Sequence, residues 1–120
     1  MSMIEQTQQL YMDVLATAAE GGIDYWCDWV RSSRTAPNAE YLALHGCRDA
    51  ETGERVQDIT LDMVRLGMRR IADGEQSVTV SSHTRAAVVS ALGDPGSADI
   101  DAEAADCIVQ VGLFGEIVYG

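Results

Sequence analysis

Two short segments carry polar residues in settings that packing alone does not demand. The first reads EGGIDYW and begins at Glu20, so a carboxylate stands at the expected C-terminal end of a helix. The helix dipole disfavours negative charge at that end, by about 0.3–1 kcal/mol at an exposed site. Glu20 therefore either points into water, with Gly21 and Gly22 only turning the chain, or has a compensating partner. In the second case Glu20, Tyr25 and Trp26 are candidate binding residues.

The second segment, residues 106–120, reads DCIVQVGLFGEIVYG. Glu103, Asp106 and Gln110 form a polar stripe at helical spacing, and at about 100° per residue Glu116 falls off that stripe. Either the helix ends just before Glu116, which then lies at the surface, or Glu116 is drawn into an apolar face and needs a donor partner. Gln110 and Glu116 complete our set of candidate ligand- or partner-binding residues.

Metal and acid–base chemistry are weaker interpretations. His45 and Cys47 lie on one face of an expected strand, and Cys27 on a neighbouring strand could complete a zinc site. The chain lacks the Cys-x-x-Cys and His-x-x-x-His pairs typical of zinc, so we expect no metal and no cofactor. Glu20 and Glu116 could act as an acid–base pair if the two segments meet, but the sequence does not fix their separation.

A thiol enzyme is also disfavoured. Cys47 or Cys107 would need a histidine and an orienting acid, and His83 stands at an expected helix start with no nucleophile motif around it. The chain also contains no phosphate-cradling glycine motif. We therefore assign no catalytic residue.

The elements that must position these residues follow from local patterns. A capping box at Ser2 predicts a first helix that stops at Gly21 and Gly22. Aromatic and β-branched residues predict a strand over residues 23–30, and polar residues predict a loop over 31–40. Strand composition resumes over residues 41–48, a turn follows at 49–54, and residues 55–59 return antiparallel.

Three further helices are expected, starting at Thr60, Ser82 and Asp101, each of which can cap a helix. The last helix is apolar nearly all round, so it belongs in the core or at a subunit interface. The predicted fold is α+β, with about three antiparallel strands packed against an N-terminal helix and two to three C-terminal helices. We expect Tyr25 and Trp26 to pack near Gln110 or Phe114.

Composition limits the class of partner. The chain has 120 residues and 47% are hydrophobic, which is enough for one domain spanning residues 1–120 that folds alone or as a homo-oligomer. Its formal net charge is −11, a sign that repels nucleic-acid phosphates and anionic lipid and favours a basic protein surface. The acidic residues are scattered, which indicates solubility rather than mimicry of a nucleic acid.

The sequence also favours a cytoplasmic protein. Three widely spaced cysteines suit reduced thiols better than a disulfide framework. No stretch reaches the roughly 18 consecutive apolar residues that a spanning helix needs, so we expect no membrane partner.

The two end segments carry a resemblance. Glu-Gly-Gly-x-x-Tyr-Trp after an N-terminal helix, paired with Ala-Asp-Cys-x-x-Gln-x-x-Leu-Phe-Gly-Glu-x-Val-Tyr-Gly, resembles a family of small uncharacterised bacteriophage proteins. Residues 59–67 match as well, and the likeness covers residues 20–120. It implies a phage gene expressed in the cytosol of a bacterial host, and it implies no activity.

The leading hypothesis is therefore a phage-encoded accessory protein that binds a host or phage protein without catalysis. The alternative is a small-ligand-binding protein with a pocket formed by the two end segments, and a small hydrolase comes third. Whether the end segments converge on a concave site or on the core separates the first two hypotheses.

Overall fold

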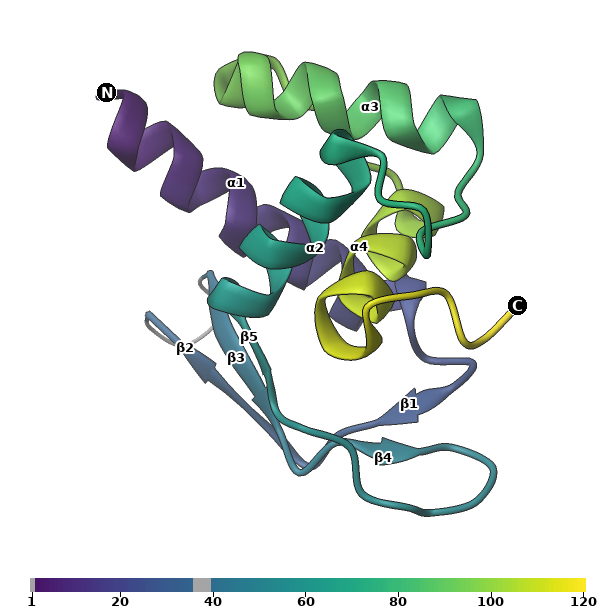
Figure 1. The fold of residues 1–120 in the computed structure, drawn as a ribbon. Coiled ribbons are helices and arrows are strands. Elements are labelled where there is room, and N and C mark those ends of the chain that lie inside the picture. Colours follow the sequence, from purple (N-terminus) through teal and green to yellow (C-terminus); the bar gives the residue numbers. More distant parts are fainter. Residues whose placement is uncertain (1, 36–39) are drawn as a thin grey trace.

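The computed structural model describes residues 2–35 and 40–120, which form a layer of helices over a layer of short strands (Figure 1). The α+β prediction is confirmed. The helices are α1 (Met3–Thr17), α2 (Leu61–Asp73), α3 (Ser82–Gly93) and α4 (Ala102–Phe114). The strands are β1 (Cys27–Asp28), β2 (Arg31–Arg34), β3 (Tyr41–His45), β4 (Arg48–Asp49) and β5 (Ile59–Thr60).

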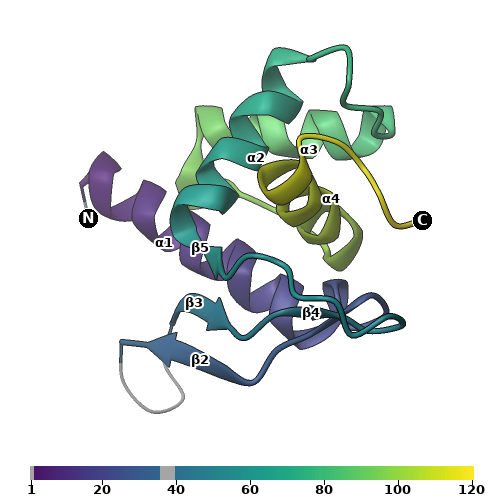
Figure 2. The same ribbon diagram turned by 60° about the horizontal axis from the view of Figure 1, so that its bottom comes forward.

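The strands form two small antiparallel sheets, which lie together below the helices (Figure 2). One sheet has the order β2-β3-β5, with Ala43 opposite Thr60, and the other pairs β1 with β4. The predicted turn at residues 49–54 is present, with Gly53 at a φ of 73°. The return of the chain is antiparallel as predicted, although only Ile59–Thr60 forms a regular strand.

The predicted strand over residues 23–30 is right only in part, because its regular strand is limited to β1 (Cys27–Asp28). Residues 23–26 form a turn closed by the amides of Trp26 and Cys27, which donate to the carbonyl of Ile23 at 3.0 and 2.9 Å. The apolar residues of this segment serve core burial, since Ile23 is fully buried and Trp26 is 3% exposed. Burial in a turn gives the same composition as a strand, so propensity misled the prediction.

The predicted loop over residues 31–40 contains strand β2, which pairs with β3. Its polar sequence, Arg-Ser-Ser-Arg, suits an edge strand, because polar and charged side chains there discourage pairing with another chain. Residues 36–39 of the predicted loop lie outside the described residues.

The helix starts were predicted well because their signals are local. Ser2 forms the complete capping box with Glu5, and the Thr60 and Asp101 side chains accept from backbone amides of their first turns. The third helix is capped by Ser81, one residue before the predicted Ser82. The first helix was predicted to stop at Gly21 and Gly22. The regular α-helix ends at Thr17, and residues 18–22 continue it as one turn of wider π-helix.

Helices α2 and α4 cross with their backbones in contact. A β-carbon on Gly67 would lie 2.0 Å from the carbonyl oxygen of Ile108, and one on Gly112 would lie 2.1 Å from that of Met63. Only glycine fits at either position without separating the helices. The close crossing makes α4 the most buried helix, as expected, with seven of its 13 residues buried.

Candidate functional site

Asp106 is the centre of a buried hydrogen-bond network between the two end segments. It lies on α4 and is only 8% exposed. The Tyr25 hydroxyl donates to its Oδ2 at 2.6 Å. Trp26 Nε1 and Gln110 Nε2 donate to its Oδ1 at 2.8 and 2.9 Å. These donors compensate for the removal of the carboxylate from water.

The sequence-based prediction that Tyr25 and Trp26 pack against the last helix is confirmed. In addition to the bonds to Asp106, the Trp26 and Phe114 rings lie 5.8 Å apart, and Gln110 Nε2 donates to the Tyr25 hydroxyl at 3.3 Å. The polar stripe of α4 therefore has an interior role at Asp106 and Gln110.

Gln110 holds the segment that follows α4. Its side chain is fully buried, and its Oε1 accepts from the backbone amides of Val118 and Tyr119, both at 2.8 Å. Its Nε2 donates to the carbonyl of Tyr119 at 3.1 Å. We call residues 117–120 the C-terminal tail. One glutamine side chain fixes the tail through its backbone.

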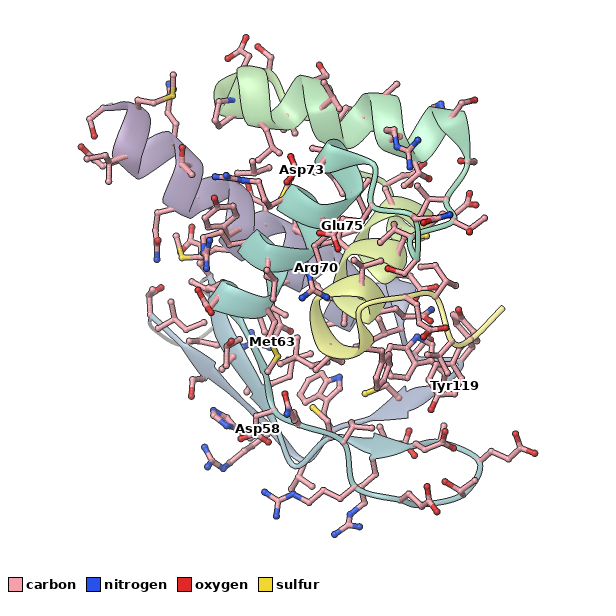
Figure 3. The ribbon with its side chains drawn as sticks, viewed as in Figure 1. Asp58, Met63, Arg70, Asp73, Glu75 and Tyr119 are labelled. Carbon is pink, nitrogen blue, oxygen red and sulfur yellow. The ribbon has the colours of Figure 1, made fainter. Side chains whose placement is uncertain are left out.

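The Tyr119 side chain adds a second attachment for the tail, and Figure 3 shows it between the tail and the strands below. Its ring stacks on Trp26 with a centroid distance of 4.6 Å and an interplanar angle of 8°. Phe114 packs at a tilt against both rings. The Tyr119 hydroxyl donates to Asp49 at the start of the 49–54 turn. The tail is thereby tied to both layers of the fold.

A cavity of about 530 Å³ opens beside this network, under the tail. Asp106 and Glu103 bring carboxylates to it, and Tyr25 and Tyr119 bring aromatic rings. Gln110 adds a carboxamide, and the other lining residues are small or apolar: Gly21, Gly22, Ala102, Cys107, Ile117 and Gly120. A β-carbon on Gly22 would lie 2.9 Å from the Ala102 carbonyl oxygen, so glycine is needed where the turn meets α4. The concave face is thus an assembly of the two end segments.

The ionisation of the site follows from its hydrogen bonds. Burial, followed by the hydrogen bond to Asp106, raises the pKa of Tyr25, so its hydroxyl remains a donor. The bond from Tyr119 lowers the pKa of Asp49 to about 2, and the bond to Asp49 raises the pKa of Tyr119 to about 12. Burial, followed by the charge of Asp106, raises the pKa of Cys107 to about 11, so this thiol stays protonated on the cavity wall.

The five sequence-predicted residues separate into two groups. Tyr25, Trp26 and Gln110 meet at Asp106. Glu20 is exposed and does not line the cavity, although the two glycines after it do. Glu116 is exposed just beyond Gly115, which ends α4 with a φ of 78°. For both glutamates the structure matches the simpler interpretation, a surface carboxylate.

Sequence reasoning missed Asp106, Tyr119 and Glu103 as site residues. Asp106 and Tyr119 lie within the quoted end segments, and the place of Asp106 and Glu103 in a stripe with Gln110 was the available signal. The contribution of Asp49 had no signal, because only the tertiary fold brings it to Tyr119.

The residues considered for zinc are placed differently. Cys27 and Cys47 are buried free thiols, and both ring nitrogens of His45 are within hydrogen-bond distance of other side chains. Across residues 2–35 and 40–120, no three His, Cys, Asp or Glu side chains are grouped so that they could hold a metal ion. In the same residues, no helix combines the length and apolar character needed to cross a membrane.

No family model, curated protein or solved structure matches the chain.

Proposed function

We propose that this chain is a binding protein whose cavity under the C-terminal tail receives a lysine or arginine side chain of a partner protein. The observation that supports this most directly is the lining of the cavity, which joins two carboxylates to two tyrosine rings around small apolar residues. A basic side chain has an apolar stem and a cationic head, so both kinds of lining would be used.

Glu103 is the residue best placed to attract the cationic head. It is exposed in the first turn of α4, at the rim of the cavity, whereas Asp106 lies deeper and is held by three neutral donors. Among the described residues, neither carboxylate takes part in an ion pair. A bound cation would therefore not have to displace an internal one.

The aromatic rings would add to this attraction. A cation within about 6 Å of a tyrosine ring gains roughly 0.5–1 kcal/mol at an exposed site. Tyr25 is 51% exposed beside Asp106, so part of its side chain is free to contact a partner. The net charge of −11 would steer a basic surface toward the protein from a distance.

The biological setting is part of the proposal. The resemblance of the two end segments to a phage family supports an accessory protein made in a bacterial host, where the partner is a host or phage protein. We expect this binding to involve no catalysis at the cavity.

The test compares two glutamates. We would titrate the protein with N-acetyl-arginine amide and N-acetyl-lysine amide and follow backbone amide shifts by NMR. Shifts should cluster at Gly22, Glu103 and Cys107, and the Glu103→Gln variant should weaken binding several-fold. Glu116→Gln is the matched control, because it also removes an exposed carboxylate, one that lies outside the cavity. An equal loss of affinity in both variants would show that only the net charge of the protein matters, and would contradict the proposal.

A second experiment identifies the partner. Cys107 is the only partly exposed thiol, since Cys27 and Cys47 are buried, so a benzophenone maleimide should attach there, although slowly, because its raised pKa leaves little thiolate near neutral pH. Irradiation in host lysate should cross-link a protein through a basic segment, and excess arginine amide should compete. Cross-linking that competitor does not reduce would place the contact outside the cavity.

The small-ligand alternative has one observation in its favour, the cavity volume of about 530 Å³, which lies within the range of small-molecule sites. Native mass spectrometry of freshly purified protein distinguishes the two. Detection of a tightly bound organic amine would favour the small-ligand alternative over a partner side chain in the cavity.

A further inference from the structure

A second cluster of polar side chains lies on the β2–β3–β5 sheet, away from the cavity. The hydroxyl of Ser33 lies 2.7 Å from Nε2 of His45. Nδ1 of the same ring lies 2.9 Å from Oδ2 of Asp58. The order hydroxyl, imidazole, carboxylate is the arrangement that activates serine for attack on acyl groups.

Sheet register explains why these residues meet. Residues directly opposite each other in an antiparallel pair share a face, so Arg31 with His45, and Ser33 with Ala43, lie on one face. Ser32 pairs with the buried Leu44 on the other face, toward the core. Asp58 stands just before β5, the strand on the far side of β3.

The carboxylate is fixed in its orienting role. Its Oδ1 accepts from the backbone amide of Gly46 at 3.1 Å while its Oδ2 faces the imidazole. The hydrogen bond to His45, followed by that from Gly46, lowers the pKa of Asp58, so it is ionised near neutral pH. An ionised Asp58 favours the proton on Nδ1, which leaves the Nε2 lone pair free to accept from Ser33.

The cluster is open to solvent. The side chains of His45 and Asp58 are 21% and 39% exposed, and Ser33 is half-buried on an edge strand. Figure 3 shows Asp58 beside the strands, well separated from Tyr119 and the tail. A substrate could reach Ser33 without passing the cavity.

We propose that Ser33, His45 and Asp58 form a serine esterase site for small carboxylic esters that carry an anionic group. Arg31, opposite His45 on the same face, binds the anionic group of the substrate. Arg55 adds a second positive charge near Asp58. Residues 31–55 carry four arginines and four acidic residues, so this region is formally neutral and repels an anion less than the rest of a chain of net charge −11.

The reaction is a two-step acyl transfer. Ser33 Oγ attacks the ester carbonyl as its proton passes to His45 Nε2, and the tetrahedral intermediate collapses with cleavage of the acyl–oxygen bond. The imidazolium returns that proton to the departing alcohol, which leaves an acyl ester on Ser33. Water then attacks the acyl carbon and gives a proton to His45. The second tetrahedral intermediate collapses with cleavage of the bond to Ser33 Oγ, which takes the proton back from His45, and the carboxylic acid is released.

Two probes test the proposal on the intact chain. A fluorophosphonate should phosphonylate Ser33, identified by peptide mass. Mono-4-nitrophenyl succinate carries a carboxylate that also speeds its spontaneous hydrolysis, so each ester is compared after its protein-free rate has been subtracted. On that basis the succinate ester should be hydrolysed faster than 4-nitrophenyl acetate. His45→Gln should lower kcat/KM about 100-fold, the range of general base catalysis. Arg31→Gln should raise KM for the succinate ester and leave that for the acetate unchanged.

Controls separate catalysis from folding. Ser32→Ala changes the neighbouring serine on the opposite face and should leave labelling and turnover unchanged. If Ser33→Ala lowers the melting temperature, Ser33→Cys keeps a nucleophile, and iodoacetamide should alkylate it at least ten-fold faster than the Ser32→Cys variant.

The proposal is overturned if the fluorophosphonate labels no serine or labels Ser32 and Ser33 alike. It is also overturned if ester hydrolysis survives in Ser33→Ala, or if the two cysteine variants react at equal rates. In those cases the cluster would only join β2, β3 and the segment before β5. Failure here leaves the proposed side-chain binding untouched, because that test reads out at the cavity under the tail.

Discussion

The network around Asp106 and the cluster around His45 each contain an aspartate carboxylate, but the two carboxylates lie in different surroundings. Asp106 is nearly enclosed, and every partner of its oxygens is a neutral donor. Asp58 is 39% exposed and faces an imidazole that can gain or lose a proton. An enclosed carboxylate with fixed donors stabilises one arrangement, whereas an exposed one beside a titratable partner can support proton transfer. Substitutions made in pairs, one in each region, can test this difference.

The largest expected contrast is between the two tryptophans. Trp26 is 3% exposed, stacks on Tyr119 and donates to Asp106, so Trp26→Ala should lower the free energy of unfolding by about 3–5 kcal/mol. Trp29 lies beside Tyr41 in the sheet region and is only partly buried. Trp29→Ala should therefore lower the free energy of unfolding clearly less. Urea unfolding followed by circular dichroism measures both. Equal losses would show that the sheet region carries as much of the core as the network does.

The same substitution in each region gives the next contrast. Asp106→Asn removes the charge that three donors share and should cost about 1.5–3 kcal/mol, the worth of hydrogen bonds to a charged group. Asp58→Asn should change stability much less, because solvent reaches its carboxylate, and should act mainly on ester turnover. Thermal unfolding and ester hydrolysis should therefore rank the two variants in opposite order. The same order in both assays would contradict the division of roles.

The sequence predicted some elements of the fold and not others. Helix starts at Ser2, Thr60 and Asp101 were predictable because a cap depends on residues within one turn. The turn at residues 23–26 was not, because core burial and strand propensity select the same apolar residues. The helix crossing at Gly67 and Gly112 was equally hidden, since it depends on which two helices meet.

The candidate sites divide in the same way. Tyr25, Trp26 and Gln110 were predicted to come together because they lie in two segments of unusual composition. Ser33 and Asp58 lie 12 and 13 residues from His45 and belong to no local motif. Only the register of β2 on β3 brings them to one histidine, and β2 itself had been predicted as a loop.

A smaller effect is expected at Gln110. Gln110→Leu keeps the volume but leaves the backbone amides of Val118 and Tyr119 without their acceptor, at a cost of about 1–3 kcal/mol. The loss should be local, so the amides of the tail should exchange with deuterium faster while those of β3 stay protected. Equal acceleration across the sheet would show that the tail and the strands unfold as one unit.

The smallest effect concerns pH. The pKa of Asp49, about 2, lies below its unfolded value of 3.8, so its contribution is complete above pH 4 and is lost as the pH falls toward 2. The pKa of Tyr119, about 12, lies above its unfolded value of 10, so its contribution is complete below pH 10 and is lost as the pH rises toward 12. Tyr119→Phe should flatten both limbs of a stability profile measured by thermal unfolding. A profile unchanged by that substitution would remove the bond to Asp49 from the attachment of the tail.

The hydrogen bonds from Gln110 to the C-terminal tail have a consequence for which residues can occupy position 118. A carboxamide offers a carbonyl and an N–H donor, the same pair that a peptide unit offers, and within the tail Gln110 bonds only to main-chain atoms of residues 118 and 119. Val118 is 53% exposed, so its side chain takes little part in docking. Position 118 should therefore tolerate many residue types, provided that the backbone amide remains, while proline alone among them would remove a bonded N–H. Helix α4 therefore holds this segment through its main chain, with little dependence on the side chain at position 118.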